Sequence, residues 1–278
     1  MNVNFSLPGL FNNFNLNKAF IALFQKNKDV FNDGFDINSV YGVFPSTKWG
    51  LERYCEDCSI KTLEEVISYY QENNISIHYE MTNPLIQEQH LNDEFCNLCL
   101  KIANKLNNAI IVSSDILKNY IKENYPNYKI ITTYVDSDAE LISYTHKNTD
   151  ELDKIEDKKK YQLLLNNFCV DDCKMQDAHI KYLANEQLND TDINPYFPCE
   201  LRFDCGFEVI KQYKRFITKE ELIEKYIPLG FENFKIATNT MIKFLPLNCT
   251  INDLIKFYVY YLIKPEYQRE ILNKFITS

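Results

Sequence analysis

The residues best suited to chemistry gather in one stretch of the sequence, Gln162–His179 (QLLLNNFCVDDCKMQDAH). A short apolar run leads into Asn166, and Cys169, Cys173 and His179 follow it within the same stretch. A buried strand that ends in amides, thiols and an imidazole is typical of the carboxyl edge of a parallel sheet, where α/β proteins place their active sites. We therefore expect a functional site at this strand end.

The cysteines suggest a metal site in the same region. Eight of the nine cysteines occur in close pairs, which are Cys55/Cys58, Cys96/Cys99, Cys169/Cys173 and Cys199/Cys205. Four thiolates around one point suit either a [4Fe–4S] cluster or tetrahedral zinc, although the spacing here matches no common ferredoxin run. We expect Cys169, Cys173, Cys199 and Cys205 to converge on one such site.

The other two cysteine pairs have different surroundings. Cys96 and Cys99 lie among leucines and isoleucines in a helical pattern, which predicts thiols buried in the core. Cys55 and Cys58 follow a strand candidate in a loop, where they could ligate a metal, take part in redox chemistry or do neither.

Eight strand candidates alternate with helical patterns along the chain. They are Asn4–Leu7, Val40–Phe44, Ser76–Thr82, Ala109–Ser113, Lys129–Tyr134, Glu140–Tyr144, Gln162–Asn166 and Asn233–Ala237. Several are short β-branched or aromatic runs without clean alternation, which indicates strands covered on both faces. Eight βα units predict an α/β fold of the TIM-like (β/α)8 barrel type. We expect a single domain over residues 1–278, with an irregular insertion at Glu186–Gln212 before the last strand.

Helix starts are marked by local capping patterns. Thr62–Glu65 (TLEE) and Thr218–Glu221 (TKEE) each have the spacing of a capping box ahead of an apolar stripe. Ser114 is placed to cap another helix, and the charged stretch Asp150–Lys160 predicts an exposed helix.

Composition excludes several classes of protein. The net charge of −9 and a pI near 5.1 argue against nonspecific nucleic-acid binding. We find neither a secretion signal nor an apolar run long enough to span a bilayer, so we expect a cytoplasmic protein without a membrane partner. The sequence contains no GxSxG, HExxH, P-loop or GxGxxG, the usual signatures of serine hydrolases, zincins and nucleotide-binding proteins.

An ordered series of segments resembles the peptidase family U32 group of barrel proteins and spans roughly residues 3–265. The segments are Phe5–Gly9, Val40–Pro45 followed by Glu52–Arg53, His78–Asn83, Tyr125–Ile130, Leu163–Cys169 followed by Cys173 and His179, Arg215–Thr218, and Gly230–Ile236. The chain departs from the family pattern at three places. Thr238–Asn239 stands where Gly-Arg usually follows the last strand, Lys174 replaces a proline, and Glu52 replaces a glycine.

This resemblance implies a TIM-like barrel and a set of expectations about function. Several family members hold a [4Fe–4S] cluster on four cysteines and act in RNA or quinone hydroxylation, and others are described as peptidases. The resemblance thus implies that Cys169, Cys173, Cys199 and Cys205 hold a cluster. The missing Gly-Arg implies a different substrate or lost catalysis.

We predict a U32-like barrel enzyme with hydroxylation or hydrolase-type chemistry on a small-molecule, peptide or RNA substrate. The predicted cavity residues are Tyr41, Arg53, Asn83, Asn166, His179 and Lys235. Arg53 and Lys235 would hold an anionic or carbonyl group, beside Tyr41. Asn83 and Asn166 would orient the substrate, and His179 would move protons. The alternative is a non-catalytic or zinc-stabilised barrel that acts as a scaffold for a protein partner.

Overall fold

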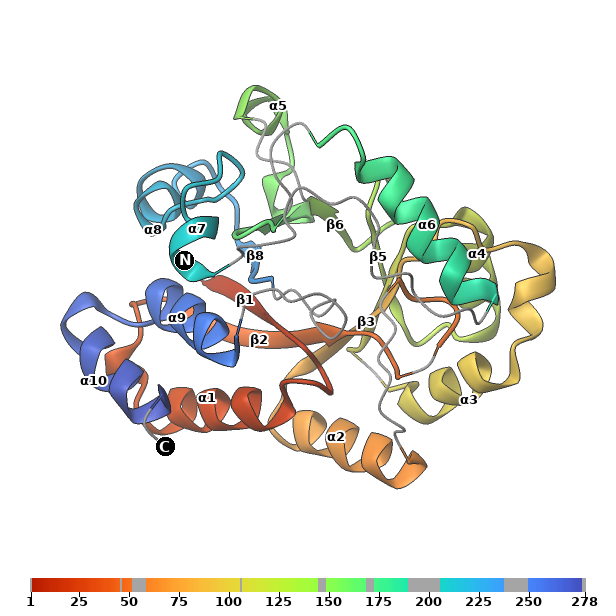
Figure 1. The fold of residues 1–278 in the computed structure, drawn as a ribbon, viewed down its shortest axis with the longest axis horizontal. Coiled ribbons are helices and arrows are strands. Elements are labelled where there is room, and N and C mark those ends of the chain that lie inside the picture. Colours follow the sequence, from red (N-terminus) through yellow and green to blue (C-terminus); the bar gives the residue numbers. More distant parts are fainter. Residues whose placement is uncertain are drawn as a thin grey trace.

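Eight parallel strands close into a barrel in the computed structural model (Figure 1). The structure describes residues 2–45, 47–51, 59–105, 107–144, 149–168, 173–189, 206–237 and 250–276. The strands are β1 (Val3–Pro8), β2 (Phe35–Gly42), β3 (Ser76–Met81), β4 (Ala109–Val112), β5 (Lys129–Thr132), β6 (Leu141–Tyr144), β7 (Tyr161–Leu164) and β8 (Asn233–Lys235). Each strand pairs with the next along the chain, and β8 returns to pair with β1.

The predicted barrel is therefore confirmed, with shifts at the ends of its elements. Strand β2 begins at Phe35, five residues before the predicted Val40, because Asp36 and Asn38 interrupt the apolar pattern there without breaking the strand. The insertion predicted from Glu186 was placed too early, because Glu186–Asn189 continues a helix. The predicted Asp150–Lys160 helix is divided between a helix ending at Lys154 and a short 3₁₀ turn at Lys158–Lys160.

Helices surround the barrel and follow most strands (Figure 1). The α-helices are α1 (Phe14–Lys26), α2 (Ile60–Glu72), α3 (Glu94–Ala103), α4 (Asp115–Asn124), α5 (Thr149–Lys154), α6 (Gln176–Asn189), α7 (Phe207–Ile210), α8 (Lys219–Glu221), α9 (Ile251–Leu262) and α10 (Pro265–Ile276). Short 3₁₀ turns are η1 (Lys28–Val30), η2 (Glu88–Asn92) and η3 (Lys158–Lys160), and η4 (Leu222–Tyr226) is a π-helical turn that follows α8.

Side-chain caps fix several helix starts. Thr218 and Glu221 form the predicted capping box, with 3.1 Å from Glu221 N to Thr218 Oγ1 and 2.8 Å from Thr218 N to Glu221 Oε2. The box predicted at Thr62 was wrong, because α2 begins two residues earlier and is capped by Ser59 Oγ, which accepts from Thr62 N. Thr62 is thus a residue inside the first turn.

The main hydrophobic core lies between the barrel and its helices. Outward side chains of the strands, such as Phe5, Ile77 and Phe234, are buried against this helical layer. The C-terminal helices complete it, since the ring of Phe20 on α1 contacts Tyr258 on α9 and Phe275 on α10 at centroid distances of 5.0 and 4.4 Å. Figure 1 shows these helices side by side, with the C-terminus next to α1.

The interior of the barrel is polar for a fold of this kind. Strand register and alternation place two central layers of four buried side chains inside it. The even-numbered strands contribute Tyr41, Ile111, Ser143 and Lys235, and the odd-numbered strands contribute Ser6, His78, Ile131 and Gln162. Branched aliphatic side chains usually dominate such layers, but only two of these eight are aliphatic.

Burial inside this interior affects the protonation of the His78 imidazole. Burial lowers the pKa of its imidazole to about 3, and the nearby charges of Lys235 and Lys129 act in the same direction. The folded state favours the neutral imidazole over the protonated one. This contribution to the unfolding free energy is therefore fully present above the unfolded pKa of about 6.5, and it is lost as the pH falls toward 3.

We predict that replacing His78 by asparagine flattens the acid side of the stability profile. Wild-type protein should lose up to about 1.4 kcal/mol more unfolding free energy than His78→Asn for each pH unit between 6.5 and 4. Urea unfolding at several pH values measures this difference. Parallel profiles for the two proteins would show that folding does not lower the pKa of this imidazole.

Candidate functional site

An ion pair lies inside the barrel near the end at which the strands terminate. We call this end, with Tyr41, Glu80 and Lys235, the carboxyl mouth. Lys235 Nζ lies 2.7 Å from Glu80 Oε1, and the two side chains are 9% and 15% exposed. The same ammonium lies 3.7 Å from the centroid of the Tyr41 ring. The arrangement holds a cation between a carboxylate and an aromatic face.

A backbone contact holds Tyr41 in place, and strand alternation brings Glu80 to Lys235. The Tyr41 hydroxyl donates to the Ile236 carbonyl at 2.6 Å, so the ring on β2 is bound to the strand that carries Lys235. Glu80 reaches Lys235 across the barrel because alternation turns His78 and Glu80 inward while Tyr79 and Met81 pack outward. A cation–π contact of this kind contributes about 0.5–2 kcal/mol.

Asn166 continues the pairing of β7 with β8 beyond Lys235. Its Nδ2 donates to the Ala237 carbonyl at 3.0 Å, and its Oδ1 accepts from Ala237 N at 2.6 Å. The side chain is fully buried. Both polar ends of the amide are therefore bound to backbone, and Asn166 fixes the strand end from which Lys235 points inward.

Asn83 has a similar position beyond β3. Its Nδ2 donates to the carbonyls of Ala184 and Lys48 at 3.0 and 3.2 Å, and its Oδ1 accepts from Leu85 N at 2.9 Å. A second bond, from Gln187 Nε2 to the Thr47 carbonyl at 2.6 Å, runs parallel to this link. These contacts hold α6 against the segments that follow β2 and β3.

Helix α6 carries the predicted histidine and follows the one described cysteine of the predicted metal group. Cys173 has a half-buried free thiol, and its carbonyl accepts from Gln176 N at the helix start. His179 is half-buried one turn into α6, and burial lowers the pKa of its imidazole. Because α6 is bound to Asn83, His179 lies on a helix anchored at the carboxyl ends of β2 and β3, and Cys173 lies just ahead of that helix.

Four predicted site residues, Arg53, Cys169, Cys199 and Cys205, lie outside the described residues, as do Cys55 and Cys58. Within the described part of the chain, no three histidine, cysteine or acidic side chains are grouped closely enough to hold a metal. The structure thus brings Tyr41 and Lys235 together and ties Asn83 to the helix of His179. The convergence of all predicted residues on one pocket stays a prediction.

Glu80 was missed by sequence reasoning. A signal was present, because β3 alternates apolar residues, which pack outward against the helices, with polar residues. Glu80 belongs to the polar set and must therefore face the barrel interior. Its partner could not be deduced, since Glu80 and Lys235 are 155 positions apart in the sequence.

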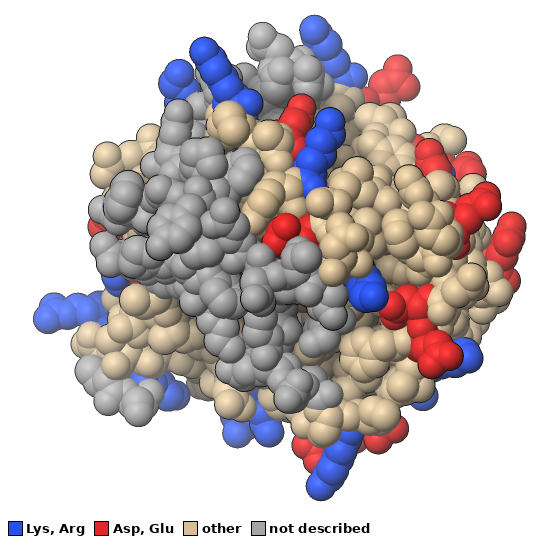
Figure 2. Space-filling view, turned by 45° about the vertical axis from the view of Figure 1, so that its right-hand side comes forward, with Lys and Arg blue, Asp and Glu red and all other residues tan. Residues whose placement is uncertain are grey.

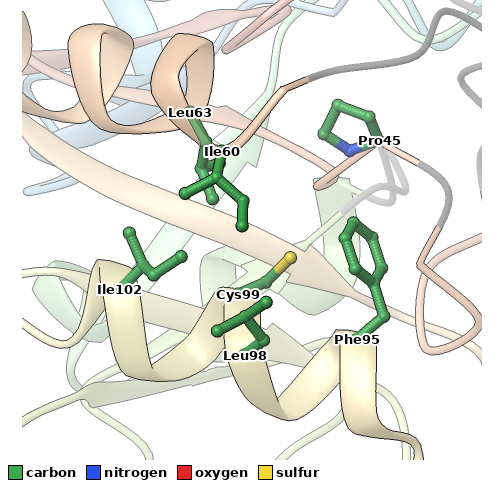
Figure 3. A pocket seen from close by; sticks show the side chains of 7 residues that line it. All are labelled: Pro45, Ile60, Leu63, Phe95, Leu98, Cys99 and Ile102. Carbon is green, nitrogen blue, oxygen red and sulfur yellow. The ribbon is translucent and has the colours of Figure 1, made fainter.

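Cys96 and Cys99 are core thiols, as predicted. They are 0% and 1% exposed on α3, and burial raises the pKa of the Cys96 thiol well above its usual range. Figure 3 shows Cys99 facing an apolar groove between α2 and α3, lined by Pro45, Ile60, Leu63, Phe95, Leu98 and Ile102. Its cavity of about 10 Å³ has room for no more than one water molecule.

The surface carries charges of both signs. On the face in Figure 2, acidic side chains gather toward the right-hand side, and lysines and arginines are scattered over the face and around its edge. No continuous basic surface is formed by the described residues on this face. None of the helices in the described ranges has both the length and the apolar character needed to cross a membrane.

Comparisons with known proteins place the fold. No family model matches the chain. A solved structure, that of the U32 peptidase Mk0906, superposes with a TM-score of 0.51 over 86% of this chain and 94% of its own, at 12% identity. The chain therefore has a U32-like barrel fold, and the predicted resemblance holds at the level of fold.

Two curated relatives carry a different name. They are the shikimate dehydrogenases (NADP(+)) of Clostridium botulinum strain 657 / Type Ba4 and strain Loch Maree / Type A3. Each is 27% identical over 196 and 201 residues respectively, which is 67% of this chain and 74% of the relative.

We predict strong energetic coupling between Lys235 and Glu80. Replacing Lys235 by methionine leaves a partly buried carboxylate without its cation, which should cost about 3–5 kcal/mol of unfolding free energy. The double variant Lys235→Met/Glu80→Met should recover most of that loss, because neither charge remains. Urea unfolding of the four proteins of this cycle gives the coupling energy.

The exposed pair Lys61–Glu65, with side chains 85% and 63% exposed, provides the control. Lys61→Met should change stability by less than about 0.5 kcal/mol. A Lys235→Met variant as stable as wild type would contradict a tight ion pair at the carboxyl mouth.

Proposed function

We propose that this chain is a U32-like barrel enzyme whose substrate binds at the carboxyl mouth through an anionic or carbonyl oxygen. The observation that supports this most is the buried Lys235–Glu80 pair beside Tyr41. Buried ion pairs contribute little net stability compared with apolar side chains of similar size, so their presence in a barrel core favours a role in function. Active sites of this fold lie at the same end.

The residues have separate roles in this proposal. When substrate binds, the Lys235 ammonium leaves its ion pair with Glu80 and binds a substrate oxygen instead. Arg53 adds a second cation to the site. Glu80 then becomes available to accept a proton. His179, whose pKa is lowered by burial, is mainly neutral at physiological pH and acts as a second base. Asn83 and Asn166 act as positioning residues, because their amides are bound to backbone.

We further propose that Cys169, Cys173, Cys199 and Cys205 hold a [4Fe–4S] cluster beside this site, with zinc as the alternative. The half-buried thiol of Cys173, just ahead of a helix anchored at the strand ends, supports this assignment. A cluster there would supply electron transfer or Lewis acidity.

The dehydrogenase name of the curated relatives is not extended to this chain. Proteins with a Rossmann fold bind a nicotinamide dinucleotide at the switch point of an open sheet, through a GxGxxG motif. This chain has a closed barrel and lacks that sequence. The two relatives therefore add no second proposal.

Metabolite binding tests the proposed site. Purified wild-type protein and the Lys235→Met/Glu80→Met double variant are incubated with a small-molecule cell extract, and retained compounds are identified by mass spectrometry. Compounds bearing a carboxylate, phosphate or carbonyl should be retained by wild type and lost from the double variant. Lys61→Met should retain the same compounds as wild type. Identical sets on wild type and the double variant would exclude binding at the carboxyl mouth.

Metal analysis tests the cluster. Anaerobically purified protein should be brown, absorb broadly near ~400 nm and contain about four iron and four sulfide per chain. Cys173→Ser should lose colour and iron, whereas Cys99→Ser should keep both, because Cys99 is buried on α3. Colourless protein with one zinc would favour the zinc-stabilised scaffold, and metal-free protein would exclude both assignments.

A further inference from the structure

A cavity opens at the end of the barrel opposite the carboxyl mouth, where the strands begin. We call this end the amino mouth. The cavity measures about 380 Å³, within the range of small-molecule sites. Its lining includes Asn38, Ser76, His78, Asn107 and Asn233, with Lys129, Lys159 and Glu140 at the rim and Ala109, Ile131 and Leu141 as apolar walls.

Small side chains leave this space open. The layer below His78, which comes from the even-numbered strands, consists of Ser39, Ala109, Leu141 and Asn233. Ser39 is bound to Ser6 and to Asn38 Oδ1, and Asn233 accepts from Asn4 Nδ2 at 3.1 Å. With only one long aliphatic side chain in the layer, the cavity extends upward to His78.

His78 lines the cavity and has one unsatisfied polar atom. Its side chain is 8% exposed, and Nδ1 is buried without a hydrogen-bond partner among the described residues. Gln162 Oε1, in the same layer, likewise lacks a partner within the described part of the chain. Leaving such a group unpaired costs about 1–3 kcal/mol, which a ligand or an ordered water would remove.

The cavity lining carries more cations than carboxylates. Lys129 forms an ion pair with Glu140 at 3.3 Å, and both side chains are about half exposed, at 47% and 55%. Lys159 pairs with Glu232 at 2.6 Å, but Glu232 does not line the cavity. The lining thus carries two cations and one carboxylate. Lys235 lies in the layer above His78, and the charges of Lys235 and Lys129 both disfavour a proton on that imidazole.

We propose that the amino mouth binds a small organic anion, a carboxylate or a phosphate ester. Its charged group lies between Lys129 and Lys159, and its body contacts Ala109, Ile131 and Leu141. A hydroxyl of the ligand lies against the His78 imidazole. This site lies at the opposite end of the barrel from the carboxyl mouth and does not depend on the function proposed there.

Nuclear magnetic resonance of the imidazoles tests this site directly. The full chain, labelled with ¹⁵N-histidine, has four imidazoles, and His78 is assigned as the signal lost in His78→Asn or by elimination with the other three variants. The probes share a three-carbon polyol body and are glycerol 3-phosphate, glycerate and glycerol. We expect a saturable shift of the His78 signal with one or both anions and none with glycerol. The two anions distinguish phosphate from carboxylate recognition.

Matched variants locate the binding. Lys129→Met, at a half-exposed rim position, should weaken anion binding by about tenfold or more, whereas Lys61→Met on α2 should leave it unchanged. Ala109→Leu should abolish binding by filling the cavity. A His78 signal unmoved by either anion, or moved equally by glycerol, would overturn the proposal and leave an internal water at His78. Unchanged affinity in Lys129→Met would also overturn it.

Discussion

Closure of the sheet between β1 and β8 is the constraint on which the rest of the structure depends. Strand β8 has three residues, yet it pairs with both β1 and β7, and Lys235 is registered to Ser6 on one side and Leu164 on the other. Closure turns Lys235 into a narrow interior where its charge must be neutralised inside the chain. Glu80, Tyr41 and the backbone bonds of Asn166 are all arranged around that requirement.

Local sequence patterns predicted what short-range physics controls. All eight strands were predicted because short β-branched and aromatic runs between turns are typical of strands. The capping box at Thr218 was found, but Ser59 was passed over, because Thr62 offered an equally good pattern two residues into the helix. Lys235 and Tyr41 were predicted as cavity residues from their positions in predicted strands.

Contacts between distant segments were beyond the same reasoning. The pairing of Glu80 with Lys235, and of Asn83 with α6, joins residues that are 155 and 101 positions apart. Asparagines at strand ends were predicted to orient a substrate, and in the structure their amides bind backbone at the strand ends. Sequence spacing cannot distinguish an amide that faces a substrate from one that replaces a missing backbone bond.

The polar interior also has a thermal consequence. Exposing apolar surface raises the heat capacity of unfolding by about 0.45 cal/K/mol per Å², and exposing polar surface lowers it by about 0.26. A barrel that buries Ser6, His78, Gln162 and Lys235 where others bury valine and leucine therefore has a smaller heat-capacity change for its size. Its stability curve is correspondingly flatter, and the folded state changes less in free energy as the temperature moves away from its optimum.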